Sequence, residues 1–403
     1  MKRFITLFIA AVCAVMFVAP AYADDKVAIS GGFRVRAWET DNQWFGGKDN
    51  SYFDQRLRLA TKINVSDDVS VQLRADWAEA TWGDGFTGGL ITRPRKSATT
   101  TLDIDRAFVD IKKEMWSLRA GQQYMGLGVN KVLDANVPGF KFDLNFAPVV
   151  TSFMYAKIDE NGALLDDGPN QDEDFYALNV GIICDTFTGN VFVAAKTDDT
   201  DTEDSPVMVG LHGSAKLGMV NLTSELAIAT GDTNAGNTDY MGTQFYLGAD
   251  ADVTDMVNIG AELLYALGTT DANEIQFTTF ANWWAFLPMG MNTPFSGDLS
   301  GVPGDEIFDP SGDSAGVQGV TLQATLKPMD IFKIGAKVGY FQPEEDSRTN
   351  FDDMTSFNVW ATYTIATNTQ LWITYLHSDP EFVAGTPDMD SERILVSQLE
   401  IKF

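Results

Sequence analysis

The chain has little of what most enzymes and metal proteins use. It carries two histidines and two cysteines in 403 residues, and Cys13 lies close to the N-terminus. Beyond that segment Cys184 has no second thiol for an intrachain disulfide. His212 and His377 accompany no catalytic triad, phosphate-binding glycine loop or Cys/His cluster at a recognisable spacing. The sequence therefore predicts no enzyme, no bound metal and no cofactor.

Positive charge is also scarce. The chain has 28 Lys and Arg residues against 56 Asp and Glu, which gives a net charge of −28. Lys2 and Arg3 are the only charged residues of the first 23, so the net charge of the remainder is −30. Because a polyanion is bound by a basic surface, nucleic acid is excluded as a partner.

A long apolar run is missing after residue 23. No later stretch offers the roughly 20 consecutive apolar residues of a membrane-spanning helix. Residues 1–23 have a basic start, an apolar run and the small-residue site Ala21-Tyr22-Ala23, which predicts a cleaved signal peptide and a single domain of residues 24–403. A lipoprotein signal at Cys13 is the alternative, but it would cut the apolar run in half.

What the chain does have is alternation. Hydrophobic residues make up 45% and aromatic residues 12%, too much for a disordered chain. Leu57 and Leu59 alternate with Arg56 and Arg58, and the same period of two recurs along the sequence. In hydrocarbon a sheet must satisfy every backbone polar group, so it crosses only as a closed barrel. The predicted fold class is all-β, a transmembrane antiparallel up-and-down β-barrel with short periplasmic turns and long external loops.

The strand count favours 18, with 16 as the alternative if the weak segments around Pro148 and 190–198 are not strands. The predicted strands are 26–39, 52–65, 69–77, 101–113, 115–126, 139–147, 149–158, 174–184, 190–198, 206–218, 219–231, 240–252, 256–268, 316–328, 331–342, 354–366, 369–379 and 390–403.

Arginines gather on one face of the first five predicted strands. A cation at mid-membrane on the lipid face costs about 2–4 kcal/mol, so we expect these side chains to line the lumen. Either they pair with inward carboxylates and simply line water, or they form a ladder whose transverse field orients and filters solutes. The predicted basic wall comprises Arg34, Arg36, Arg56, Arg58, Arg74, Arg106 and Arg119. The candidate carboxylates are Asp54, Asp76, Asp103, Asp105 and Asp110.

The third long connection, 126–138, is the candidate constriction loop. Its charged residues are Lys131 and Asp134, so its net charge is zero and the basic wall would dominate with a weak anion preference. External segments such as 198–204 and 344–346 are strongly acidic and would attract cations instead. Divalent cations bound loosely by these carboxylates are plausible partners, although a solvated acidic surface is the simpler interpretation. These opposing charges leave the net selectivity open.

The longest connection, 269–315, is rich in Phe and Trp, and exposed aromatic surface of that size is a liability. We expect this segment to pack on something. Folding over the rim of its own barrel is the simplest arrangement, and contact with another protomer or plugging of the mouth are the alternatives.

Several motifs resemble a known family when taken in order. They are the opening Val27-Ala-Ile-Ser-Gly-Gly-Phe-Arg-Val-Arg-Ala-Trp38, Gln55-Arg-Leu-Arg-Leu59, Asp105-Arg-Ala-Phe-Val-Asp-Ile-Lys112 and Leu118-Arg-Ala-Gly-Gln-Gln-Tyr124. Phe403, on the apolar face of the last strand, resembles the assembly signal of bacterial outer-membrane β-barrels. Together these features resemble the outer-membrane homotrimeric porins of sulfate-reducing bacteria, although general trimeric porins usually have 16 strands.

That resemblance implies a trimer in outer-membrane lipid, each barrel holding a water-filled channel through which small hydrophilic solutes and ions diffuse passively. A substrate-specific porin for organic acids or sugars is the alternative within transport. A structural or adhesive outer-membrane barrel with a closed lumen is the alternative from another class.

Overall fold

The computed structural model describes residues 26–42, 49–82, 102–160, 172–198, 205–233, 238–271, 273–277, 280, 315–349, 351–383 and 390–403. The predicted signal peptide lies outside these residues. Within them, no helix has the length and apolar character needed to span a membrane. The only helical element given there is a short 3-10 turn, η4, over Asp346–Arg348.

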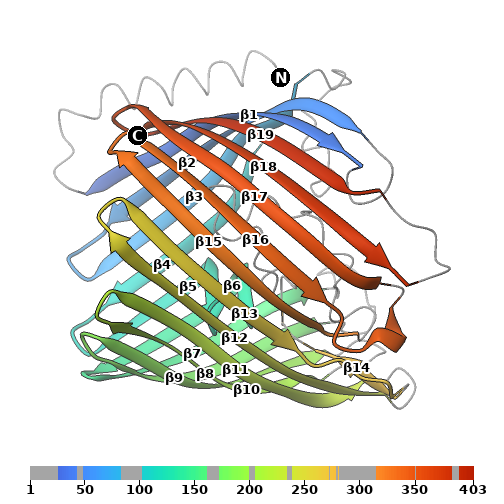
Figure 1. The fold of residues 1–403 in the computed structure, drawn as a ribbon. Helices are drawn as coiled ribbons and strands as arrows, with labels where there is room; N and C mark the ends of the chain where they lie inside the picture. The colour runs from blue at the N-terminus through green and yellow to red at the C-terminus, as the bar shows by residue number, and fades with distance from the viewer. Residues whose placement is uncertain are drawn as a thin grey trace.

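Eighteen strands of the described chain close into one antiparallel barrel, as the favoured strand count predicted (Figure 1). Sequential neighbours pair around the ring, β13 pairs with β15, and β1 closes the ring by pairing with both β2 and β19. A nineteenth strand, β14, spans only Glu274–Gln276 and pairs in parallel with β12, so it adds no wall strand. The wall strands are β1 Val27–Asp41, β2 Asn50–Asn64, β3 Val69–Thr81, β4 Leu102–Lys112, β5 Trp116–Leu127, β6 Leu133–Phe146, β7 Val149–Glu160, β8 Asp172–Ile183, β9 Phe187–Asp198, β10 Val207–Leu217, β11 Val220–Thr233, β12 Thr238–Thr254, β13 Val257–Ala266, β15 Val317–Met329, β16 Phe332–Gln342, β17 Phe351–Ala366, β18 Thr369–Phe382 and β19 Glu392–Lys402.

The period of two separates the two faces of the wall. On β10, Val209 and Leu211 are each 52% exposed, whereas the intervening Gly210 and the preceding Met208 are buried. Successive side chains of a strand point to opposite faces, so the exposed aliphatic residues form the outer face. This is the arrangement that a barrel in hydrocarbon requires.

Short turns alternate along the chain with connections that are longer, as predicted, except at 128–132 and 234–237, which span only five and four residues. The short turns gather at one end of the barrel, where β1 begins and β19 ends (Figure 1). Gly218 and Asn368 sit in two such turns with φ of 63° and 61°, a left-handed conformation that glycine and asparagine tolerate best. Tight hairpins of this kind fix the register of each strand pair.

One predicted boundary is wrong. The segment 126–138 is not a loop, because β5 continues to Leu127 and β6 already begins at Leu133. Only residues 128–132 form the turn between the two strands. The predicted weak strands at 139–147, 149–158 and 190–198 are all present, as parts of β6, β7 and β9.

Candidate functional site

The first two strands carry the most buried part of the basic wall. Arg34 lies opposite Arg56, and Arg36 lies opposite Asp54, so all four side chains share one face. The Arg36 guanidinium, with a side chain 1% exposed, donates to the Asp54 carboxylate at 2.8 and 2.7 Å. Trp38 Nε1 donates to the same carboxylate at 2.9 Å. Burying this charge pair is tolerable because each partner is hydrogen-bonded.

A second carboxylate serves two arginines of β2. Arg58 lies opposite Asp76 of β3 and donates to both of its oxygens at 2.6 and 2.7 Å, a two-point charged contact. Arg56 Nη1 lies 3.9 Å from the same carboxylate. Asp76 is therefore shared between neighbouring arginines on the inner face.

A register shift brings a third carboxylate to this face. Arg74 lies opposite Arg106, and the next pair is Ala75 with Ile104, so Asp105 is an extra residue in β4. Arg74 Nε donates to both Asp105 oxygens at 2.9 Å, and Arg58 Nη2 lies 3.5 Å from that carboxylate. Strict alternation would have turned Asp105 outward. The bulge instead places its carboxylate between Arg74 and Arg58 on the inner face.

The wall ends at Arg119 of β5, which lies opposite Asp110 of β4 at 3.6 Å and stacks on Phe108 at 4.7 Å. All seven predicted arginines thus lie on one face of five consecutive strands, and Asp54, Asp76, Asp105 and Asp110 pair with them. This geometry matches the first of the two sequence-based interpretations, in which arginines pair with inward carboxylates. A filtering role for the wall stays a prediction.

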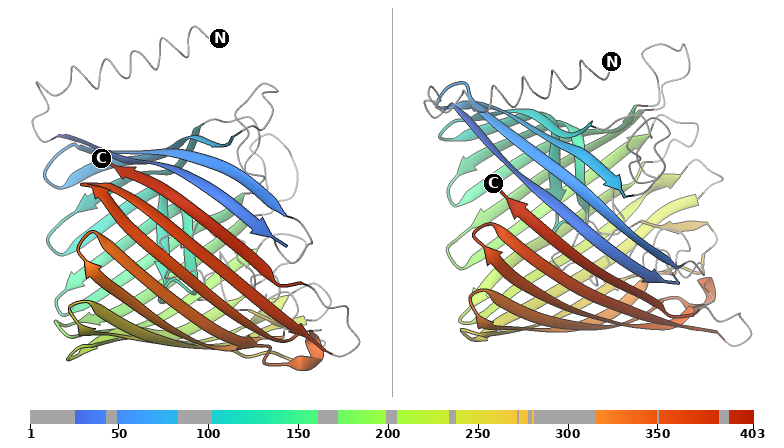
Figure 2. Two further views of the ribbon diagram at one scale, coloured as in Figure 1. Left: turned by 45° about the horizontal axis from the view of Figure 1, so that its top comes forward. Right: turned by 90° about the horizontal axis from the view of Figure 1, so that it is seen from above.

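Beyond Gln122, the end of the β5–β6 hairpin leaves the wall. β4 pairs with β5 only as far as Gln122, and β7 pairs with β6 only from Gly139 onward, so the residues between them pair with each other alone. Gly121 marks the departure with φ of 123°, where a Cβ would lie 2.3 Å from the Ala107 carbonyl oxygen. The hairpin, in teal, stands inside the ring of strands (Figure 2).

This inward hairpin is amphipathic. One face carries buried apolar residues, and it packs on inward apolar residues of the wall strands β7–β11, among them Phe175 and Phe192. The burial of this face removes apolar surface from water and holds the hairpin against the wall. The buried apolar residues of the hairpin are Met125, Leu127, Val132, Leu133 and Val137.

The other face of the hairpin meets the basic wall at Arg106. Arg106 Nε donates to the Asn136 side-chain oxygen at 2.9 Å, and its guanidinium lies 5.3 Å from the Tyr124 ring. The Tyr124 hydroxyl hydrogen-bonds with Asp134. The sequence did not single out Tyr124 or Asn136, although their alternation with Met125 and Val137 is a strand signal that could have found them.

The two predicted constriction residues lie in different surroundings. Asp134 belongs to the polar face beside Tyr124, whereas Lys131 lies in the turn, is 1% exposed and has its ammonium 4.5 Å from the Tyr246 ring of β12. The tip of the hairpin therefore reaches from β5 and β6 to strands six positions further around the barrel.

Part of the aromatic segment 269–315 also packs inside. The Phe280 ring contacts Phe277 and Phe175 at centroid distances of 5.0 and 5.1 Å, and Phe280 N donates to the Val132 carbonyl at 3.0 Å. This part of the segment packs on the hairpin and the inner wall. Residues 281–314 lie outside the described residues, as do the acidic residues 199–204.

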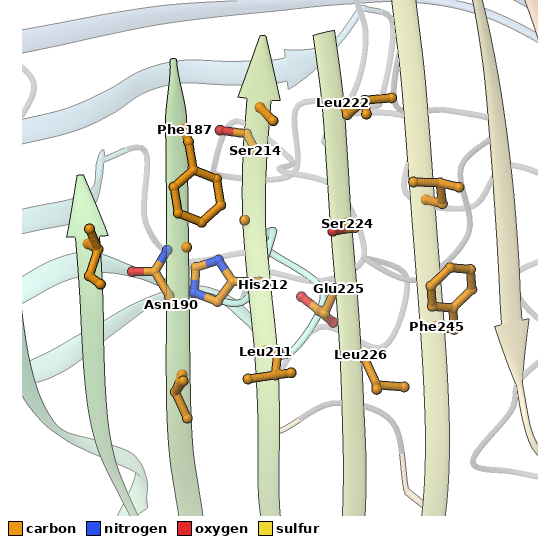
Figure 3. Close-up of a pocket in the computed structure, with 16 residues that line it drawn as sticks. Phe187, Asn190, Leu211, His212, Ser214, Leu222, Ser224, Glu225, Leu226 and Phe245 are labelled. Atoms are coloured by element: carbon orange, nitrogen blue, oxygen red, sulfur yellow. The ribbon is translucent and has the colours of Figure 1, made fainter. Parts of the chain in front are cut away.

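A groove of about 550 Å³ lies on the other side of the wall (Figure 3). The small residues Gly189, Gly213 and Ala215 form its floor, and exposed aliphatic residues such as Leu211 and Val191 flank it. These flanking residues belong to the outer, lipid-facing set, so the groove is part of the outer surface rather than of the lumen.

The described residues contain no group of three or more His, Cys, Asp or Glu side chains placed to hold a metal ion. His212 and His377 lie on β10 and β18 and contact Phe192 and Phe357 respectively. Loosely bound divalent cations at the acidic external segments therefore stay a prediction.

Comparisons with known proteins show the fold. No protein-family model matches the sequence, and no curated protein matches it. Among solved structures, OccAB2 of Acinetobacter baumannii has a TM-score of 0.60 at 12% identity, covering 94% of this chain and 98% of that one. OpdK of Pseudomonas aeruginosa, solved with vanillate, has 0.60 at 10% identity over 93% and 99%. The outer-membrane channel DcaP of A. baumannii has 0.51 at 14% identity over 94% and 97%.

Proposed function

We propose that this chain is a bacterial outer-membrane porin whose lumen lets small hydrophilic solutes and ions diffuse passively. The observation that carries the proposal is a closed barrel with an aliphatic outer face and a charged inner face, crossed by a hairpin whose polar side meets that inner face. Such a cylinder satisfies its backbone polar groups by hydrogen bonds between strands and keeps its charges in water. Its similarity in fold to an outer-membrane channel supports this function.

We place the constriction where the hairpin approaches the basic wall, at Arg106, Asn136 and Tyr124. Near Arg106, Arg58 pairs with Asp76 and Asp105 and Arg74 pairs with Asp105, whereas Arg106 itself donates to the neutral Asn136 side chain. In a narrow passage the fixed charge of Arg106 acts strongly on a permeating ion, and it favours anions.

Conductance across planar bilayers tests both proposals. Purified protein should give stepwise ohmic currents, and the reversal potential in a salt gradient should move toward cation selectivity when Arg106→Gln removes the constriction charge. Lys327→Gln is the matched control, since Lys327 lies near a short turn and pairs with Asp330 at 2.8 Å. Absence of current would contradict the channel and favour a structural or adhesive barrel. Equal selectivity in both variants would refute the constriction at Arg106.

A substrate-specific porin for organic acids is the second candidate. It is favoured by the concentration of arginines on one wall and by the fold shared with OpdK, which was solved with vanillate. Block of the ion current by millimolar aromatic carboxylates, but not by neutral sugars, would distinguish this candidate from a general porin.

We also propose a homotrimer belonging to the porins of sulfate-reducing bacteria, on the strength of the sequence resemblance. Chemical cross-linking in outer-membrane vesicles should then give a ladder that ends at the trimer, and bilayer currents should close in three equal steps.

A further inference from the structure

A cluster of buried charges lies where the hairpin tip meets the far wall. Lys131 of the turn lies near Glu225 of β11 and Glu262 of β13, and Lys337 of β16 completes the cluster. All four side chains are at most 10% exposed. Buried charges are tolerated when they are paired and hydrogen-bonded, and two lysines balance two glutamates here.

Glu225 binds the hairpin itself. One carboxylate oxygen accepts the backbone N–H of Val129 at 2.7 Å, and the other accepts Gln244 Nε2 at 3.0 Å. A Cβ at Gly128 would lie 2.1 Å from this carboxylate, so the glycine allows the turn to approach it closely. The turn therefore fits around the Glu225 side chain.

Glu262 belongs to the wall side of the cluster. It accepts hydrogen bonds from Tyr246 at 3.0 Å and Thr321 at 2.8 Å, and it forms an ion pair with Lys337. The Tyr246 ring in turn faces the Lys131 ammonium. The wall thus holds the Glu262 carboxylate and the Tyr246 ring in place by its own contacts, and the hairpin adds the Lys131 ammonium beside them.

We propose that Lys131 is a positioning residue, which fixes the hairpin tip between Glu225 and Glu262 and so sets the width of the constriction. The inference rests on the proposed channel function. Removing one partner of a buried charge cluster is strongly destabilising, whereas replacing both members of a pair by neutral residues is tolerated. Lys131→Met should therefore loosen the hairpin, and Lys131→Met combined with Glu225→Gln should restore it.

Glu225→Gln can remove the charge at position 225 without removing the hydrogen bonds made there. A glutamine at position 225 keeps an oxygen for Val129 N–H and gains an amide donor. Gln244 Oε1 can take that donor after an amide flip, because it is buried and accepts no hydrogen bond within the described part of the chain. The double variant thus removes both charges and keeps the hydrogen bonds.

Thiol labelling measures hairpin position without any ion current. Val132 in the turn is 0% exposed, so Val132→Cys in a Cys184→Ser background should react with a maleimide slowly, while the exposed Cys184 of the unmodified chain gives the fast reference. Adding Lys131→Met should speed labelling by about tenfold or more, and adding Glu225→Gln as well should slow it again. Lys216→Met, which removes an exposed lysine of β10, is the matched control and should change nothing.

Bilayer recordings of the same variants should show larger and noisier single-channel currents for Lys131→Met, with the unmodified pattern in the double variant. Labelling and currents of Lys131→Met equal to those of the unmodified chain would overturn the proposal, because apolar packing alone would then hold the hairpin. Failure of both variants to fold would also overturn it, since the cluster would then serve the wall. A silent unmodified protein would refute the channel, while labelling would still test the role of Lys131.

Discussion

At the scale of the residue, barrel closure depends on a glycine beneath the terminal aromatic ring. Gly31 and Phe403 exchange two backbone hydrogen bonds, of 2.8 and 3.0 Å. A Cβ at Gly31 would lie 2.4 Å from the Arg58 carbonyl oxygen and 2.9 Å from the Phe403 ring. Gly32 differs, since the nearest atom to its Cβ would be 3.5 Å away.

We therefore expect Gly31→Ala to lower the free energy of unfolding by about 1–3 kcal/mol through overpacking at the β1–β19 seam. Gly32→Ala, the matched control on the same strand, should cost far less. The temperature at which the folded band converts to the unfolded band on a gel measures both. Equal conversion temperatures would contradict the role assigned to Gly31.

At the scale of the element, the β5–β6 hairpin combines two tasks. Its ends belong to the wall, and its tip pairs only with itself and packs on the inner face. The tip is thus separable from the wall in strand pairing, but not in apolar burial or in the hydrogen bonds it makes with Glu225 and Arg106.

Replacing residues 122–138 by a two-residue Asn-Gly turn keeps Gly121 opposite Gly139 and should therefore keep the barrel closed and raise its conductance. Stability should fall, because inner-wall residues such as Phe175 and Phe192 would become exposed to water, at about 1.5–3 kcal/mol for each fully uncovered large side chain. Single-channel conductance and urea unfolding in detergent measure the two effects. An unchanged conductance would show that the hairpin does not set the narrowest point.

At the scale of the whole molecule, the aliphatic outer face of the barrel is the feature that suits the chain to a lipid bilayer. Leu211 and Ser214 lie on the same strand, but alternation places them on opposite faces. Leu211 is exposed on the outer face among other aliphatic residues. The Ser214 hydroxyl lies on the inner face, 2.8 Å from the Thr188 hydroxyl.

Leu211→Arg should accordingly destabilise the barrel in bilayers by about 2–4 kcal/mol, because it places a cation in hydrocarbon. Ser214→Arg adds the same charge to the lumen and should leave stability nearly unchanged while shifting ion selectivity toward anions. Equilibrium unfolding in lipid vesicles and reversal potentials give the two readouts. Similar losses of stability for both would show that the two faces have been assigned incorrectly.

The sequence alone determined the local and repetitive features of this protein. Alternation is a property of neighbouring residues, so it predicted the strands, the inward arginines and 18 rather than 16 strands. Interactions between distant segments could not be predicted in this way. The bulge at Asp105 depends on the register with β3, and the path of residues 123–138 depends on the apolar inner wall and Glu225. Only the tertiary structure decided those, because the energy that turns a hairpin inward comes from contacts with residues about a hundred positions away in the chain.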